Sequence, residues 1–430
     1  MPSSSTSVVE RYHLKTDDIA DEGDDARPNR QGRVYSHARS RRPGGIRVDE
    51  ALFGMKMAHL SCTDDSEERL KGSGANTVEA LKEIVGVDDV HKPLSELLDK
   101  HFDLKLDCWM NESGIRWGRP VDTQGFIASN HDTIVLSYRF STTALDWMTN
   151  LSTASSEWEP SVDELIGHAG LCSCYDGLFT KWFTSRGKPR VHTGFYNNFL
   201  YTLPMVRKHI LQPLLASDAT PKKVYICGCS LGAAISTMAF CFLLEELYPM
   251  LMNPNHVHHK LVLVTAGSPR VCDPKMHRQV TDKVNELRAL DRALICRMVY
   301  NYDIVPHIPL HLVSGFRHLD TLVYLTPRGD VLINPALPNS QNFAEIGQVL
   351  TSFQKKEAQG KDKQIITTKV YTTNEDDDND IDRNGTDLDH MEKTPFEIEV
   401  EKTPGPIKDH MPFWYLTILQ KLKAKQDAAD

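Results

Sequence analysis

The sequence lacks any uninterrupted apolar run long enough to cross a membrane, and any strong excess of charge of one sign. No stretch reaches the roughly 18 uncharged apolar residues that a membrane-spanning helix needs. The best candidate, residues 231–244, is shorter and rich in small residues, which is typical of a buried helix. The 430 residues include 49 basic and 58 acidic ones, a net charge of −9, so nothing indicates a nucleic-acid partner. We therefore expect an ordinary globular protein with a large core.

A basic leader followed by an apolar segment is also missing. The chain starts Met1-Pro2-Ser3, and acidic residues follow between 17 and 22, so neither a signal peptide nor a transit peptide is indicated. The nine cysteines are odd in number, and several lie in apolar strand or helix patterns, where free thiols behave as small hydrophobic side chains. We expect no disulfide framework and a cytoplasmic location, with peripheral membrane association left open.

Composition divides the chain into a tail, a main domain and an insertion. Residues 1–50 are polar and contain few large apolar side chains, which predicts a disordered tail. Residues 339–395 contain an acidic run and predict a flexible, solvated insertion. We expect the remaining parts, 51–338 and 396–425, to form one domain.

Strand and helix patterns alternate through this domain. Helical spacing between about 51 and 110 predicts helices that pack on the main sheet. Short, nearly all-apolar strands then follow, separated by helices, and this order indicates an α/β fold with a parallel or mostly parallel sheet covered on both faces. The expected strands are 125–128, 133–138, 223–227, 261–265, 294–300 and 321–324, and the helices between them are 199–215, 231–247 and 279–290.

The turn Gly228-Cys229-Ser230-Leu231-Gly232 carries the clearest chemical signal. It follows an apolar strand and leads directly into a helix, which is the context that a nucleophile elbow requires. The two glycines avoid collisions in a sharp turn, so that the Ser230 hydroxyl stands clear of the sheet. The backbone N–H of Leu231 then lies at a helix N-terminus, where it favours a developing oxyanion. The sequence therefore predicts a serine hydrolase with Ser230 as nucleophile.

A serine nucleophile needs a histidine base and a carboxylate that orients it. Asp303 directly follows a predicted strand, at the end where active-site loops lie, and is the candidate carboxylate. Two histidines compete for the base. His318 lies 15 residues after Asp303 and just before a strand, and His410 lies in a loop before the C-terminal helix. Spacing does not choose between them, although the freer loop position slightly favours His410.

Several motifs follow one another in a fixed order and carry a family resemblance. They are Arg139-Phe140-Ser141-Thr142-Thr143 with Asp146-Trp147, Val191-His192-Thr193-Gly194-Phe195, Gly228 to Gly232, Ala266-Gly267-Ser268-Pro269-Arg270, Asp303-Ile304-Val305-Pro306 and Asp409-His410. Together they resemble the fungal-type (class three) triacylglycerol lipase family, over roughly 121–334 plus the C-terminal end. The resemblance implies an α/β-hydrolase fold and no cofactor or metal.

The resemblance also implies the site residues. It assigns the triad to Ser230, Asp303 and His410, and the oxyanion hole to Leu231 with Ser141. Residues 150–188 occupy the place of the family's lid, although an ordinary packed insertion explains them equally well.

Two residues depart from the family pattern. Cys229 stands where the family usually has histidine, and Phe140 stands beside the oxyanion residue where it usually has glycine. A small thiol can pack behind an elbow, whereas a phenylalanine resists backbone conformations that glycine permits.

These motifs predict an enzyme that hydrolyses carboxylic ester bonds of acylglycerols or related lipids through an acyl-enzyme. The expected partners are a lipid ester substrate and, transiently, a membrane or lipid-droplet surface. The alternative is a lipase-like protein of impaired activity that serves as a binding or scaffold module, an idea that rests on Phe140.

Overall fold

A computed structural model of the chain describes residues 47–63, 75–116, 119–140, 154–160, 187–216, 219–301, 303–309, 315–319, 322–327, 329, 331–333 and 409–428. All of these belong to one unit, Ile46–Asp430. The predicted insertion 339–395, most of the predicted tail and most of the predicted lid lie outside the described residues.

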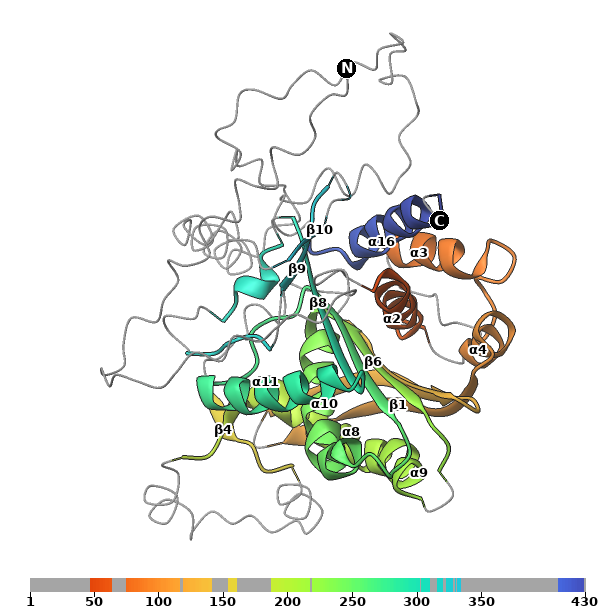
Figure 1. The fold of residues 1–430 in the computed structure, drawn as a ribbon. Coiled ribbons are helices and arrows are strands. Elements are labelled where there is room, and N and C mark those ends of the chain that lie inside the picture. The colour runs from red at the N-terminus through yellow and green to blue at the C-terminus, as the bar shows by residue number, and fades with distance from the viewer. Residues whose placement is uncertain are drawn as a thin grey trace, which may run out of the picture. The chain divides into compact units, whose positions relative to one another are not determined.

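A single sheet of eight strands is the frame of this unit (Figure 1). In spatial order its strands are β1 (Lys105–Arg116), β2 (Arg119–Ser129), β3 (Thr133–Tyr138), β6 (Lys223–Cys229), β7 (Lys260–Ala266), β8 (Ala293–Tyr300), β9 (Leu322–Leu325) and β10 (Val331–Ile333). The neighbours from β3 to β9 pair in parallel, and β1, β2 and β10 join antiparallel at the edges. A small second sheet pairs β4 (Ser155–Glu157) with β5 (Arg190–His192). The predicted mostly parallel sheet is therefore confirmed.

Helices cover both faces of the sheet, and the alternation of side chains along the strands decides which helices each residue meets. In β6, Val224 and Ile226 point into one core, whereas Tyr225, Cys227 and Cys229 point into the other. The first core is closed by α8 (Thr193–Val206), η2 (Arg207–Leu211), α9 (Gln212–Leu215), α10 (Ser230–Met252) and α11 (Pro274–Ala289). The second is closed by α2 (Val48–Leu60), α3 (Ala75–Val85), α4 (Leu94–Phe102) and α16 (Pro412–Asp427).

Helix α10 is the predicted buried helix, and it is longer than expected. Among the described residues, α10 is the one helix that is long and apolar enough to cross a membrane, with 23 residues. However, 83% of its most apolar window is buried inside the protein. Packing between the sheet and α8 accounts for this composition, as expected for a core helix.

Several boundaries differ from the sequence predictions. Helix α2 begins at Val48, inside the predicted tail, because its apolar residues pack in the second core. Helix α16 continues to Asp427, two residues past the predicted end of the domain. Strand β1 starts at Lys105, in a region where helices were expected, because it pairs along its length with β2. A strand that is stabilised by such pairing need not show a regular alternation of apolar and polar residues in its own sequence.

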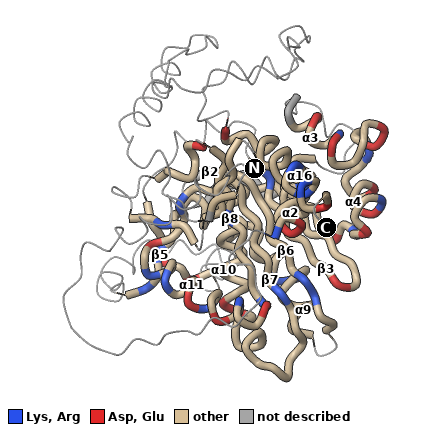
Figure 2. The backbone as a smooth tube through the Cα atoms, turned by 45° about the horizontal axis from the view of Figure 1, so that its top comes forward, with Lys and Arg blue, Asp and Glu red and all other residues tan. Residues whose placement is uncertain are grey.

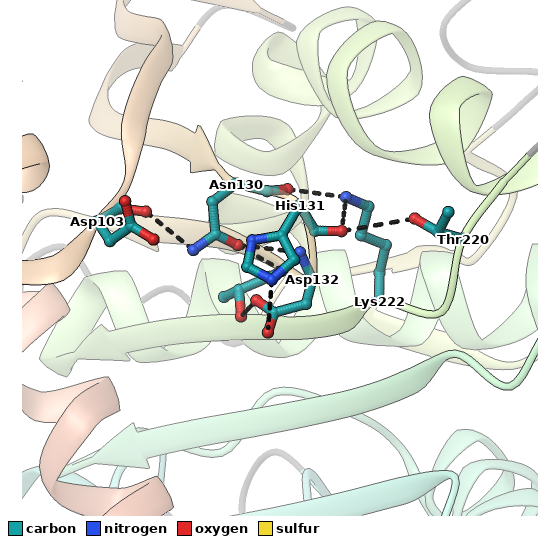
Figure 3. Close-up of polar contacts among 7 residues, drawn as sticks. Asp103, Asn130, His131, Asp132, Thr220 and Lys222 are labelled. Atoms are coloured by element: carbon teal, nitrogen blue, oxygen red, sulfur yellow. Dashed lines mark hydrogen bonds and ion pairs between the residues drawn. The ribbon is translucent and has the colours of Figure 1, made fainter.

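Polar groups stabilise the end of the sheet that lies opposite to the serine turn. The amide of Asn130 donates to the carbonyl oxygen of Asp103 at 2.8 Å, and its oxygen accepts from the backbone of Asp132 and Thr133 (Figure 3). The Lys222 ammonium donates to the carbonyl oxygen of Asn130 at 2.7 Å and ties this turn to the start of β6. Charged residues otherwise gather on outer helices such as α4, α11 and α16 (Figure 2). The contacts of Asn130 and Lys222 therefore stabilise this turn and give it a structural role.

Candidate active site

The serine turn forms the sharp bend that its sequence predicts. Strand β6 ends at Cys229 and helix α10 begins at Ser230, whose φ of 54° lies in the left-handed region. A non-glycine residue rarely adopts this conformation, and here it joins a strand directly to a helix. A Cβ at Gly232 would collide with the carbonyl oxygens of Tyr138 and Arg139, so the turn passes as close to the end of β3 as glycine allows. The geometry is that of a nucleophile elbow.

The Ser230 hydroxyl is buried but not committed to a structural hydrogen bond. The residue is 2% exposed, and among the described residues its Oγ has no hydrogen-bond partner. Most buried hydroxyls are hydrogen-bonded, so an uncommitted one at a strained turn marks a candidate reactive group. Leu231 lies in the first turn of α10, and Cys229 gives this helix no side-chain cap. The free backbone N–H groups at the start of α10 and the positive end of its dipole therefore favour an anion beside Ser230.

Asp303 and His410 come together although 107 residues separate them in the chain. Nδ1 of His410 lies 2.9 Å from both carboxylate oxygens of Asp303, and the two residues are 6% and 0% exposed. Because a carboxylate accepts, Nδ1 carries the proton and Nε2 keeps its lone pair. Nε2 has no hydrogen-bond partner among the described residues. A histidine in this state is suited to act as a general base.

Asp303 is held by two further donors. The backbone N–H of Val305 donates to Oδ1 at 2.9 Å, and the hydroxyl of Tyr415 donates to Oδ2 at 2.6 Å. The Tyr415 oxygen in turn accepts from the backbone N–H of Tyr300 at 2.9 Å. Burial, followed by the charge of Asp303, raises the pKa of Tyr415 well above its ordinary value, so its hydroxyl stays a donor. A buried carboxylate is thereby surrounded by donors that fix its orientation.

Other contacts place the histidine loop and the aspartate. The amide of Asn301, at the end of β8, donates to Asp409 at 2.9 Å, immediately before His410. Gly267 packs directly against the pair, since a Cβ there would lie 2.6 Å from Asp303 Oδ2 and 2.8 Å from His410 Nδ1. The loops after β7 and β8 and the start of α16 thus meet at one end of the sheet.

The competing histidine is engaged elsewhere. Nε2 of His318 lies 2.7 Å from the carbonyl oxygen of Pro306, which requires a proton on this nitrogen. Its own carbonyl oxygen accepts from Nδ1 of His277 at 2.7 Å. Burial and the charges of Arg297 and Arg270 lower the pKa of His318 well below its ordinary value, so the ring is neutral. These bonds give His318 a structural role in the loop that carries Asp303.

The second predicted oxyanion residue, Ser141, lies outside the described residues, but its neighbour Phe140 is placed. The Phe140 side chain is 8% exposed and belongs to the second core. Its ring lies 6.1 Å from the ring of His59, at an interplanar angle of 74°. Cys229, the other departure from the family pattern, is also buried, 3.8 Å from the Met55 sulfur. Both unusual side chains therefore point into the core between the sheet and α2.

Of the predicted site residues, the structure brings Asp303 and His410 into contact and places Ser230 and Leu231 at the elbow. Their catalytic roles remain predictions. Sequence reasoning did not find Tyr415 or Asn301, since a tyrosine at the start of an apolar helix looks like an ordinary core residue. Among the residues that the structure describes, no group of three or more His, Cys, Asp or Glu side chains is arranged to hold a metal.

Comparison with known proteins gives a family match and distant structural neighbours. Residues 135–313 match the family model of class 3 lipases. No curated protein matches the chain. A mono- and diacylglycerol lipase from Aspergillus oryzae is 18% identical, with a TM-score of 0.45, and the match covers 69% of this chain and 89% of that one. Lipase II from Rhizopus niveus is 18% identical, with a TM-score of 0.39 and coverage of 65% and 82%.

The family match spans three of the features described above. The matched residues contain the elbow at Ser230, the loop with Gly267 and the aspartate Asp303. His410 and the helices α2, α3, α4 and α16 lie outside it. Residues 135–313 of this α/β fold are therefore similar to the class 3 lipase family.

Proposed function

We propose that this protein hydrolyses carboxylic ester bonds of acylglycerols or related lipids through a covalent acyl-enzyme on Ser230. The contact that carries the proposal is the buried 2.9 Å pair of Asp303 and His410. Ser230, in the left-handed conformation of an elbow, supplies the candidate nucleophile. A Ser-His-Asp arrangement of this kind performs acyl transfer on unrelated folds.

Acylation begins at the Ser230 hydroxyl. Nε2 of His410 accepts its proton while Oγ attacks the ester carbonyl carbon, and Asp303 holds the ring and stabilises the imidazolium that forms. The carbonyl oxygen becomes an oxyanion, which the N–H of Leu231 and the helix dipole of α10 stabilise together with Ser141. The carbon–oxygen bond to the leaving alcohol then breaks, and the alcohol oxygen takes the proton from His410.

Deacylation repeats these steps with water. His410 accepts a proton from the water as the water oxygen attacks the acyl carbon. The bond between this carbon and Ser230 Oγ then breaks, Oγ takes the proton back from His410, and the fatty acid leaves. The oxyanion hole serves both steps. No step in this scheme requires a cofactor.

The direct test is covalent labelling with a fluorophosphonate probe, which phosphonylates an activated serine. We expect the purified full-length protein to be labelled and Ser230→Ala to lose the label. Ser236→Ala is a matched control, because this serine lies on the same helix with its hydroxyl bonded to the Cys227 carbonyl oxygen at 2.6 Å. Labelling that survives in Ser230→Ala, or no labelling of the wild type, would contradict the proposal.

The substrate class requires a separate measurement. A panel of triacylglycerol, diacylglycerol, monoacylglycerol, phospholipid and galactolipid esters would rank the preferred substrate by kcat/KM. We expect acylglycerols to lead the panel. Hydrolysis confined to soluble, non-lipid esters would sink the lipid assignment while leaving the serine hydrolase intact.

We further propose transient contact with a lipid surface and a cytoplasmic location. Lipid esters concentrate in membranes and droplets, so an enzyme that hydrolyses them must reach such a surface. Free thiols at all seven cysteines in the described ranges fit a reducing compartment. Co-sedimentation with vesicles or emulsion, and fractionation of cells, would test the two proposals separately.

The alternative, an inactive binding or scaffold module, rested on Phe140 beside the oxyanion hole. The Phe140 side chain is buried in the core against His59, and Phe140 is not among the described residues with a positive φ, so its backbone does not need the freedom of glycine. The alternative is not favoured.

A further inference from the structure

Helix α2 lies outside the part of the chain that matches the lipase family, yet it contacts both sides of the predicted oxyanion hole. One side of this hole is the elbow, Cys229-Ser230-Leu231, and the other is predicted to follow Phe140 in the chain. Met55 and His59 stand four residues apart on α2, which places them on the same face, one above the other. Each contacts one side of the hole.

Met55 contacts the elbow. It is 0% exposed, and its sulfur lies 3.8 Å from the sulfur of Cys229, which immediately precedes Ser230. Burial raises the pKa of the Cys229 thiol well above its ordinary value, so this residue remains a neutral packing group. A shift of Met55 would therefore displace Cys229, the residue that ends β6 and precedes α10.

His59 contacts the other side through the edge-to-face packing of its ring with Phe140. The ring is 1% exposed, and Nδ1 donates to the carbonyl oxygen of Met55 at 2.8 Å, which fixes its orientation. Burial lowers the pKa of His59 to about 4, so the ring packs as a neutral aromatic group near pH 7. Burial raises the pKa of Cys62, just beyond the helix, and the charge of Arg139 followed by the backbone of Phe140 partly offsets this rise.

Helix α2 is itself held firmly against the sheet. A Cβ at Gly54 would lie 2.5 Å from the Cβ of Val264 in β7, so the helix approaches the sheet as closely as glycine permits. At its start, Glu50 accepts from the Tyr225 hydroxyl and pairs with Lys223 at 3.2 Å. An anchored helix can fix the relative position of the two groups that it touches.

We infer that α2 is a brace for the oxyanion hole, in which Met55 and His59 act as positioning residues for Cys229 and Phe140. The predicted second donor follows Phe140 directly in the chain, so we expect its position to depend on how Phe140 is held. The two departures from the family pattern are the two residues that α2 contacts here. The larger Phe140 and the smaller Cys229 thus form one packing arrangement with this helix. The inference rests on the proposed function, since it concerns the same site.

The brace predicts a specific kinetic signature. Loss of one oxyanion donor costs about 100- to 1,000-fold in kcat, and a displaced donor should cost less. We expect His59→Leu to lower kcat by about 10-fold with KM within about 2-fold of wild type. The affinity for a phenylboronic acid, whose adduct with Ser230 resembles the tetrahedral intermediate, should fall with kcat. His59→Phe, which keeps an aromatic ring against Phe140, should retain kcat within about 2-fold.

Two further variants complete the experiment. Phe140→Leu should resemble His59→Leu, and the double variant should lose no more than the worse single one, because both remove the same contact. Phe53→Leu is the matched control, since this ring lies on the same helix but packs 4.5 Å from the Tyr225 ring and 6.3 Å from the Phe102 ring. It should lower thermal stability and leave kcat unchanged.

The outcomes are distinct. If wild type hydrolyses esters and His59→Leu lowers the melting temperature while kcat and boronate affinity stay unchanged, the brace is wrong and the proposed function stands. Multiplicative losses in the double variant would also overturn it. If wild type neither hydrolyses esters nor reacts with fluorophosphonate, the proposed function fails and the brace fails with it. Met55→Leu, which nearly conserves volume, gives a variant that should fold and tests the elbow side by the same readouts.

Discussion

Replacement of Tyr415 by phenylalanine removes one hydroxyl from the buried surroundings of Asp303. Two hydrogen bonds are lost: the 2.6 Å bond to Oδ2 of Asp303 and the 2.9 Å bond from the N–H of Tyr300. A hydrogen bond to a charged group contributes about 1.5–3 kcal/mol, and a buried N–H without a partner costs about 1–3 kcal/mol. Because the two bonds share one oxygen and the site can relax, we expect a loss of about 2–4 kcal/mol in unfolding free energy. Urea denaturation followed by circular dichroism measures this loss.

The same change should also lower activity. Asp303 keeps its bonds from His410 and from the N–H of Val305, so its orientation is loosened but not lost. An altered triad carboxylate can cost about 10,000-fold in kcat, which sets an upper limit. With two of the three donors retained, we expect a loss of about 10-fold in kcat on a soluble ester.

Tyr248→Phe is the control for this prediction. The Tyr248 hydroxyl also donates to a carboxylate, that of Glu286, but between α10 and α11, 18 residues along α10 from Ser230. We expect a loss of at most about 1 kcal/mol in stability and no change in kcat. If Tyr415→Phe matches this control in both stability and kcat, the reasoning that Tyr415 holds the carboxylate is refuted.

Three further predictions address the same site and its surroundings. Gly267→Ala should abolish ester hydrolysis, because its Cβ would lie 2.6 Å from Asp303 Oδ2, and a kcat near that of wild type would contradict this packing. His410→Ala should abolish fluorophosphonate labelling, whereas His318→Ala should lower stability and keep part of the labelling; the reverse pattern would show that the base is misassigned. The pKa of His59 is lowered to about 4 from 6.5, so below pH 6.5 the unfolded chain binds the extra proton, and stability should fall by about 1.5–2 kcal/mol between pH 6.5 and 5. Urea midpoints at the two pH values should show a smaller drop in His59→Phe, and an equal drop would exclude His59 as its source.

Local sequence was sufficient for the elements whose signals are short-range. The strand 133–138 was predicted with its observed bounds, and the turn around Ser230 was recognised because strand, glycines and helix follow one another directly. Asp303 was found for the same reason, as a carboxylate just after a buried strand. Strand β1 and the start of α2 were missed, because their stability comes from pairing and packing with residues far away in the chain.

The base could not be chosen by spacing. His318 is closer in sequence to Asp303, but its Nε2 is occupied by a backbone carbonyl, whereas His410 reaches Asp303 across 107 residues. Phe140 shows the same limit. In sequence it is a residue that resists the backbone conformations open to glycine, and only the position of α2 reveals that its ring is buried against His59.

The sequence by itself determined that this protein has an α/β fold with a serine at a strand–helix turn, because periodicity and turn chemistry are properties of neighbouring residues. The family resemblance implies His410 as the base, and the tertiary structure brings it against Asp303. The tertiary structure alone decided that Tyr415 completes the hydrogen bonds of this carboxylate, and that α2 contacts Cys229 and Phe140. These contacts join residues more than 80 positions apart, and chain closure over such distances is set by the packing of the whole sheet and its helices.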